Sequence, residues 1–204
     1  MQTEAKPKLE ALPDLFYSQS TLAIAKGLIG QWLVHEVGEE TLVAKITETE
    51  AYLGTLDRAC HSYGRRRTNR TRVLYGEPGH AYTYVMHTHC LLNVVCEPKG
   101  QAEAVLIRAV EPLHGIEAME RLRGLPAHVR HFSDGPGKLT KAMGITMQHY
   151  DLSLQERPLY IARGEENLTV NSSPRIGIGG AGESKHYPWR FFEANSRYVS
   201  KFRA

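Results

Sequence analysis

Residues 31–52 read QWLVHEVGEETLVAKITETEAY, and their pattern indicates an antiparallel β-sheet. Residues 31–37 and 41–52 are rich in Val, Leu, Ile and Thr, a composition typical of β-strands. The segment Gly38-Glu39-Glu40 between them is short and polar, so it predicts a hairpin between two antiparallel strands.

The rest of the chain repeats this pattern of strands joined by hairpins. Further strands are predicted over residues 82–86, 90–96, 104–110, 159–163 and 174–178. Three helices are expected: one that Ser20 caps and that ends at Leu28, one from Pro112 to about Arg123, and one opened by residues 135–138 that ends at Met143. We therefore expect a mixed α/β (α+β) fold, a single domain with a curved, largely antiparallel sheet, a protruding β-hairpin and surrounding helices.

Composition excludes several classes of protein. The chain has 204 residues, of which 42% are hydrophobic and 23% are charged, ordinary values for a globular protein. Its apolar runs are much shorter than the roughly 18 residues that a membrane span needs. The polar first residues do not resemble a signal peptide, and we expect residues 1–12 to be a disordered tail. Three cysteines, Cys60, Cys90 and Cys96, are an odd number, which favours reduced thiols.

Positive charge is concentrated in two segments. Residues 58–76 hold six arginines and no acidic residue, although the net charge of the chain is only +3. Residues 185–203 contain five basic residues interleaved with aromatic ones. Such segments suit phosphates and stacked bases, but a solvated basic loop and an aromatic core strand give the same pattern. Charge alone leaves both interpretations open.

Three short motifs have competing interpretations. Residues 177–182 match G-x-G-x-x-G but lack the helix and the distant acidic residue of a dinucleotide site, so a Rossmann fold is not predicted. The histidines and cysteine at 87, 89 and 90 suggest a metal site, yet no C-x-x-C or H-E-x-x-H pattern supports one. Gly135-Pro136-Gly137-Lys138 suits either an anion site or a plain helix start.

The strand TETEAY places Glu48, Glu50 and Tyr52 on one face, because side chains alternate along a strand. Glutamates in that position are commonly exposed to solvent. Alternatively, one of them acts as a general base beside a stacking ring.

Taken in order from about residue 15 to residue 192, these segments resemble the alkyladenine (3-methyladenine) DNA glycosylase family, mammalian type. The resemblance rests on residues 48–54 (ETEAYLG), 61–62 (HS), 82–84 (YTY), Asn93, 105–112 (VLIRAVEP), 135–139 (GPGKL) and 175–179 (RIGIG). It implies a single DNA glycosylase domain over residues 13–204. The implied enzyme flips a damaged purine out of duplex DNA and hydrolyses its N-glycosidic bond, without a metal, a cofactor or a covalent intermediate.

The resemblance also implies roles for individual residues. Glu50 matches the general base, Arg108 matches the arginine that helps to hold the attacking water, and Ile178 matches a position whose backbone carbonyl contacts that water. Tyr52 on one side, with His61 and Tyr84 on the other, match the residues that sandwich the flipped base. Asn93 matches the asparagine that disfavours guanine.

One departure concerns the hairpin after the Tyr-x-Tyr strand, where family members have a wedge residue, usually Tyr followed by Gly. Here the chain reads YVMHTHC over residues 84–90, and we expect Met86 or His87 to fill the stack that the flipped nucleotide leaves. The remaining DNA contacts are expected from Arg65, Arg66, Arg67, Arg70 and Lys138, through phosphates.

The expected partner is double-stranded DNA with a damaged purine: 3-methyladenine, 7-methylguanine, hypoxanthine or ethenoadenine. We expect a monomer with no membrane association and no obligate protein partner, located in the cytoplasm (nucleoid) of a bacterium or the nucleus of a eukaryote. Two alternatives stay open. A non-catalytic damage-binding protein would not need Glu50, and a metal-dependent nuclease would use residues 87, 89 and 90.

Overall fold

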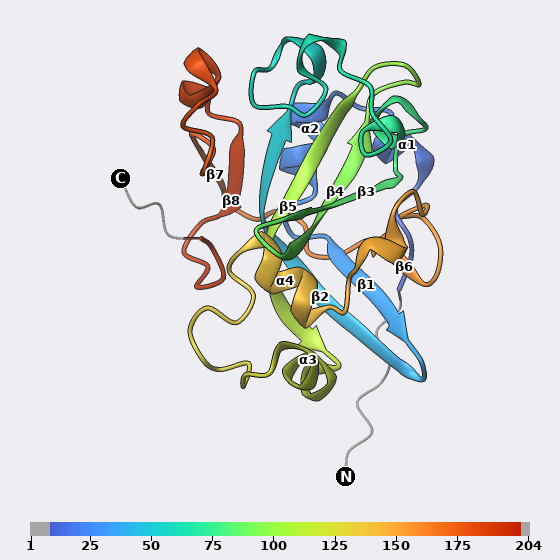
Figure 1. The fold of residues 1–204 in the computed structure, drawn as a ribbon. Helices are drawn as coiled ribbons and strands as arrows, with labels where there is room; N and C mark the ends of the chain where they lie inside the picture. Colours follow the sequence, from blue (N-terminus) through green and yellow to red (C-terminus); the bar gives the residue numbers. More distant parts are fainter. Residues whose placement is uncertain (1–8, 201–204) are drawn as a thin grey trace.

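The structure, a computed structural model, describes residues 9–200. Within them one eight-stranded sheet has the order β3-β4-β5-β2-β1-β6, while β8 pairs with both β2 and β7. All pairings are antiparallel. The strands are β1 (Trp32–Val37), β2 (Glu40–Tyr52), β3 (Ala81–Met86), β4 (His89–Cys96), β5 (Glu103–His114), β6 (Leu159–Ala162), β7 (Val170–Ser173) and β8 (Arg190–Glu193), as Figure 1 shows. The mixed α/β fold expected from the sequence is confirmed.

The two long strands β2 and β5 form the centre of the sheet. Their pairing shifts register between Ile46 and Thr49, and such bulges bend strands. One side of β2 faces helix α2 (Thr21–Gly27), where the Thr49 hydroxyl donates a hydrogen bond to the Ala25 carbonyl at 2.7 Å. Because side chains alternate, Glu50 points to the opposite side, where the candidate site lies.

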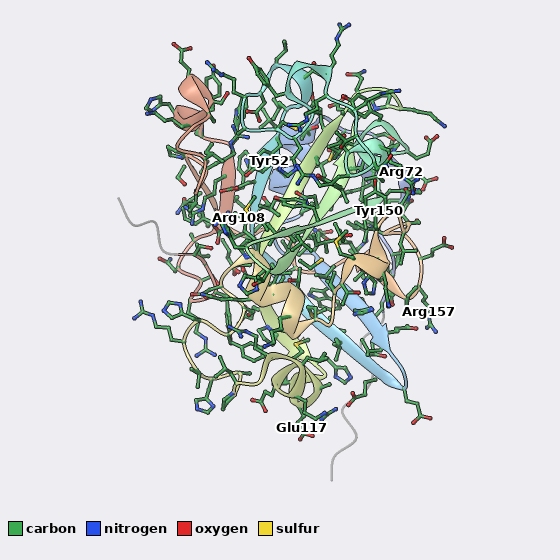
Figure 2. The ribbon with its side chains drawn as sticks, viewed as in Figure 1. Tyr52, Arg72, Arg108, Glu117, Tyr150 and Arg157 are labelled. Carbon is green, nitrogen blue, oxygen red and sulfur yellow. The ribbon has the colours of Figure 1, made fainter. Side chains whose placement is uncertain are left out.

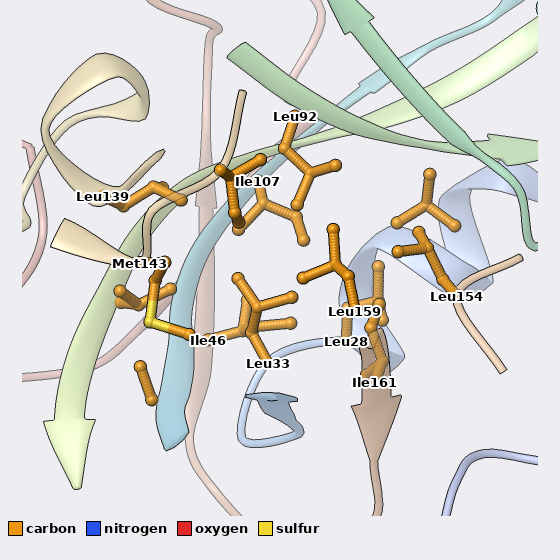
Figure 3. Packing of buried hydrophobic residues seen from close by; sticks show 14 of the residues in the cluster. Leu28, Leu33, Ile46, Leu92, Ile107, Leu139, Met143, Leu154, Leu159 and Ile161 are labelled. Atoms are coloured by element: carbon orange, nitrogen blue, oxygen red, sulfur yellow. The ribbon is translucent and has the colours of Figure 1, made fainter. Parts of the chain in front are cut away.

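The main core lies between the sheet and the helices. One buried cluster, shown in Figure 3, forms this core. It includes Leu28 directly after α2, Ile46 and Ile107 from the central strands, and Leu139 from α4 (Pro136–Ala142). Burying each such side chain contributes about 1.5–3 kcal/mol, so this cluster is the main source of stability. It gives the site side of the sheet a rigid base.

Two of the three predicted helices are confirmed, and the start of the third is wrong. Ser20 caps α2 as expected, accepting a hydrogen bond from the backbone N–H of Ala23, and α4 lies within its predicted segment. Helix α3 (Ile116–Arg123), however, starts four residues later than Pro112. The reason is that β5 stays paired with β2 as far as His114, and Pro112, which lacks an N–H, sits at a register shift where the ladder tolerates it.

The strand predicted over residues 174–178 is also wrong. That segment is irregular, and strands form on either side of it instead, at β7 and β8. Strand β8 pairs with β2 at Glu50↔Arg190 and Glu48↔Phe192. Consequently the segment between β7 and β8 reaches the site face of β2, where the N–H of Ile176 binds Glu50. Strands β7 and β8 lie at the upper left of Figure 1.

Residues near the start of the described chain are paired rather than disordered. Ala11 forms a bridge with Ala162, and the Leu12 N–H donates to the Ile161 carbonyl at 2.9 Å. The pairing of residues 11 and 12 differs from the disorder expected for them, and residues 1–8 of the expected tail lie outside the described part. Helix α1 (Asp14–Tyr17) follows directly. Among residues 9–200, no helix has the length and apolar character needed to cross a membrane.

Candidate active site

Glu50 is fully buried near the end of β2, and two hydrogen bonds and one ion pair hold its carboxylate. Oε1 accepts a hydrogen bond from the backbone N–H of Ile176 at 2.7 Å, and Oε2 accepts one from the Tyr52 hydroxyl at 2.8 Å. The guanidinium of Arg108, on the neighbouring strand β5, lies 3.3 Å from Oε2. Contacts from three separate segments therefore fix the orientation of this carboxylate.

A second buried glutamate, Glu48, positions the arginine. Its Oε1 accepts hydrogen bonds from Nε of Arg108 at 2.9 Å and Nε of Arg190 at 2.6 Å, while its Oε2 accepts the N–H of Ser200 at 2.6 Å. Because Glu48 binds one edge of the Arg108 guanidinium, the other edge is directed at Glu50. The sequence pattern suggested two similar glutamates, whereas the structure gives them different surroundings.

A cavity of about 450 Å³ opens beside these charged groups, a volume within the usual range for small-molecule sites. The lining contains six of the seven residues predicted for catalysis and base binding, the exception being Glu50, together with Met86: Tyr52, His61, Tyr84, Asn93, Arg108 and Ile178. These residues come from four strands and two loops, and Figure 2 labels Tyr52 and Arg108 on neighbouring strands. The fold thus brings together residues more than 120 positions apart.

The aromatic side chains of the cavity are uncharged at neutral pH. Burial, and then the nearby Glu50 carboxylate, raise the pKa of Tyr52 well above its usual value, so its hydroxyl keeps the proton that it donates to Glu50. Burial also raises the pKa of Tyr84 to about 12. Burial, followed by the charges of Arg70 and Arg66, lowers the pKa of His61 to about 4. The cavity therefore presents neutral rings to a ligand.

Tyr82 belongs to the site through hydrogen bonds that the sequence analysis did not predict. Its hydroxyl lies 2.8 Å from Nδ1 of His61, and its backbone carbonyl accepts a hydrogen bond from the Asn93 amide at 2.9 Å. The rings of His61 and Tyr84 meet edge to face, with centroids 4.6 Å apart. Tyr82 thus links three predicted pocket residues. The Tyr-x-Tyr spacing was the available signal, because it places both rings on the same face of β3.

The segment after β7 supplies a contact to Glu50 that the sequence analysis did not predict. Ile178 lines the cavity as expected, and its carbonyl accepts a hydrogen bond from the Ala181 N–H at 3.0 Å. The backbone group that touches Glu50 is the N–H of Ile176. No sequence signal marks this contact, because any residue but proline supplies an N–H.

The β3–β4 hairpin ends beside the cavity. His87 and Thr88 form a two-residue turn with φ values of 46° and 72°, an uncommon conformation for residues other than glycine. Met86, which is 43% exposed, lines the cavity, and His87 is exposed at the turn. Among the described residues, no cluster of three or more His, Cys, Asp or Glu side chains could bind a metal ion, so residues 87, 89 and 90 do not assemble one.

Helix α4 packs against strand β4 of this hairpin. A Cβ on Gly137 would come within 2.6 Å of the His89 side chain, so only glycine permits this approach of helix and strand. The Thr140 hydroxyl donates to the Cys90 carbonyl at 2.6 Å. Lys138 is engaged locally, since its Nζ donates to Asp134 at 2.8 Å.

The arginine-rich segment lies in an exposed loop. Arg65, Arg66, Arg67 and Arg70 are all exposed, and none of them pairs with a carboxylate of residues 9–200. The guanidinium of Arg70 lies 5.9 Å from the Tyr84 ring centroid, so the loop reaches the cavity. The hydroxyl of Tyr150, labelled in Figure 2, donates to the carbonyl of Arg70 at 3.2 Å and fixes the loop.

A buried carboxylate beside an aromatic cavity, with exposed arginines next to it, is an arrangement that suits catalysis on a base of nucleic acid. The sequence profile of the methylpurine-DNA glycosylase (MPG) family matches residues 15–197, and the chain belongs to this family. It is therefore a DNA glycosylase of base excision repair, and DNA is its partner.

Three bacterial relatives bear the name "Putative 3-methyladenine DNA glycosylase". The protein from Shouchella clausii is 63% identical over 195 residues, which cover 95% of this chain and 98% of the relative. The protein from Bacillus licheniformis is 50% identical and covers 96% and 99%. The protein from Bacillus subtilis is 49% identical and covers 93% and 96%.

Proposed function

We propose that this enzyme removes alkylated or deaminated purines from double-stranded DNA and hydrolyses the N-glycosidic bond with a water molecule that Glu50 activates. The substrates would be 3-methyladenine, 7-methylguanine, hypoxanthine and ethenoadenine. The observation that supports this most strongly is the geometry of Glu50: a buried carboxylate, held by two hydrogen bonds and an ion pair, directly beside a cavity lined with aromatic rings.

The chemistry of base loss suits these groups. As the base departs, the sugar develops oxocarbenium-like positive charge, which a nearby carboxylate stabilises while it accepts a proton from the attacking water. Arg108, 3.3 Å from the same carboxylate, would hold that water by hydrogen bonding. An alkylated purine is already cationic, so it leaves readily and binds favourably against the rings of Tyr52 and Tyr84.

Neutral lesions such as hypoxanthine need a proton on the base before it leaves. His61 does not supply that proton at neutral pH, because its pKa of about 4 keeps the imidazole unprotonated. Its role would be to contact the base, as one side of the sandwich opposite Tyr52. Asn93, whose amide nitrogen donates to the Tyr82 carbonyl, is held in place at the cavity wall, where its side chain would leave no room for the exocyclic amine of guanine.

The surroundings of the cavity support recognition of flipped DNA. Extrusion of a nucleotide costs a few kcal/mol, and it costs least for a damaged or mispaired base. Met86 or His87, at the hairpin turn beside the cavity, would fill the vacated stack. The phosphates would be bound by Arg65, Arg66, Arg67 and Arg70, and by Lys138 if it releases Asp134. We expect a monomer without an obligate protein partner, located in the nucleoid because the relatives are bacterial.

The decisive experiment measures single-turnover base release from a duplex with one hypoxanthine or one methylated purine. Wild type, Glu50→Gln and the control Glu36→Gln are compared in the presence of a chelator. Glu36 is a suitable control because it pairs with Arg157 at the surface. We expect release by wild type and the control, and a loss of about 10²–10⁴-fold for Glu50→Gln with lesion binding retained.

Other outcomes would favour other functions. Tight lesion binding with no release by any variant, for every lesion tested, would indicate a damage-binding protein. Loss of activity on addition of the chelator would indicate a metal-dependent nuclease.

A further inference from the structure

An ion pair beside the site has no part in the proposed chemistry. Arg175 and Asp57 have fully buried side chains, and they form two hydrogen bonds, of 2.6 Å and 2.9 Å, although they lie 118 residues apart in the sequence. Replacing a buried ion pair by apolar residues of similar volume is often neutral or stabilising. Stability alone is therefore a weak explanation for this pair, and its position relative to the cavity suggests another.

Arg175 supports the Tyr52 ring. The centre of its guanidinium lies 4.6 Å from the centroid of that ring and 5.0 Å from the centroid of the Trp189 ring. Its Nη1 also donates to the carbonyl of Ala51, the residue before Tyr52, at 2.8 Å. Because Arg175 is buried and does not line the cavity, it contacts Tyr52 from behind the surface that would face the base.

Arg175 also fixes the backbone group that binds Glu50. It directly precedes Ile176, whose N–H donates to Oε1 of Glu50. The guanidinium is anchored by Asp57, so the peptide that follows it has little freedom to move away from the carboxylate.

Asp57 organises the other side of the cavity. Its two carboxylate oxygens accept hydrogen bonds from the backbone N–H groups of Leu53, at 3.1 Å, and Ala59, at 3.0 Å. These bonds close the turn that leads from Tyr52 to His61, the residues expected on opposite sides of the base.

We propose that Asp57 and Arg175 are a positioning pair for base excision. The pair fixes the separation between Tyr52 and His61 and holds the Ile176 N–H against Glu50. Neither side chain is placed to touch the substrate, so both act through other residues. This inference rests on the proposed function of Glu50 and of the cavity.

The test removes both charges together with the double variant Asp57→Asn/Arg175→Met, which keeps side-chain volume and leaves no unpaired buried charge. Arg175→Lys is the second variant, because lysine keeps the charge but cannot make two parallel hydrogen bonds. The matched control is Glu77→Gln/Lys99→Met, which removes an exposed ion pair of 2.9 Å. Thermal unfolding is measured with single-turnover release of hypoxanthine, at saturating enzyme and across a pH series.

We expect the double variant to unfold cooperatively but to release base about 10- to 100-fold more slowly, the usual cost of misplacing a reacting group. Its pH–rate profile should also differ from that of wild type, because the Ile176 N–H no longer holds the Glu50 carboxylate. Ethenoadenine fluorescence should report weaker stacking on Tyr52. Arg175→Lys should be intermediate, and the control should match wild type.

A folded double variant with the wild-type rate and pH profile would overturn the inference. If that variant does not fold, an unchanged rate and pH profile for Arg175→Lys would overturn it equally. Failure of the proposed function would look different, because wild type itself would then release no base.

Discussion

Replacing Tyr52 by phenylalanine tests how the site controls its carboxylate. The change removes one hydroxyl and keeps the ring, so a base can still stack. The lost interaction is a 2.8 Å hydrogen bond to the Glu50 carboxylate. Hydrogen bonds to charged groups contribute about 1.5–3 kcal/mol, and about 1.4 kcal/mol of activation free energy corresponds to a tenfold change in rate.

The expected loss is therefore about 10- to 100-fold in the release rate, and the lower value is favoured because the Ile176 N–H and Arg108 still bind Glu50. Lesion affinity should change little, because the ring that would stack on the base is kept.

The assay is single-turnover release of hypoxanthine from a duplex across a pH series, with lesion affinity measured separately. Tyr160→Phe serves as the control, because Tyr160 is buried in β6 at the far edge of the sheet. A release rate equal to that of wild type would refute the view that the Tyr52 hydroxyl holds Glu50 in place for catalysis. A large loss of affinity with an unchanged release rate would instead place the function of Tyr52 in binding alone.

Three further predictions concern the surroundings of the cavity. Arg70→Ala should raise the pKa of His61 from about 4 toward 6.5, because a positive charge near the ring is lost, and an NMR titration of the imidazole measures this. The folded state resists protonation of His61, so the free energy of unfolding should rise with pH between about 4 and 6.5, and it should rise less in the variant. Equal His61 pKa values in wild type and variant would exclude this influence of Arg70. Met86→Ala or His87→Ala should reduce flipping, followed by ethenoadenine fluorescence, whereas unchanged flipping in both would exclude a wedge at the hairpin turn. Arg65→Ala should lower the slope of log affinity against log salt by about 0.9, provided that Arg65 contacts one phosphate.

Features that depend on neighbouring residues could be predicted from the sequence. Alternating and β-branched runs indicated the hairpin of β1 and β2, the pair β3 and β4, and therefore the antiparallel sheet, because strand patterns and short turns are local properties. The pairing of Tyr52 with Glu50 also follows from local geometry, since residues two apart share a face of a strand. The run of arginines in residues 58–76 remained exposed, as its charge suggested.

Errors arose where distant segments decide local structure. The helix start at Pro112 was wrong because pairing with β2 extends β5 beyond the point where proline usually begins a helix. The strand expected at residues 174–178 was wrong because the backbone N–H of Ile176 binds a side chain instead of a neighbouring strand.

The chemical groups of this protein, and the short strands and turns that contain them, follow from the sequence alone, because propensity, alternation and turns act over a few residues. The contacts between distant groups follow only from the packing of the folded chain. The Ile176 N–H reaches Glu50 across 126 residues, and Arg175 reaches Asp57 across 118. Backbone donors and buried ion pairs of this kind leave no periodic signal in the chain, since their partners are selected by the packing of the whole sheet.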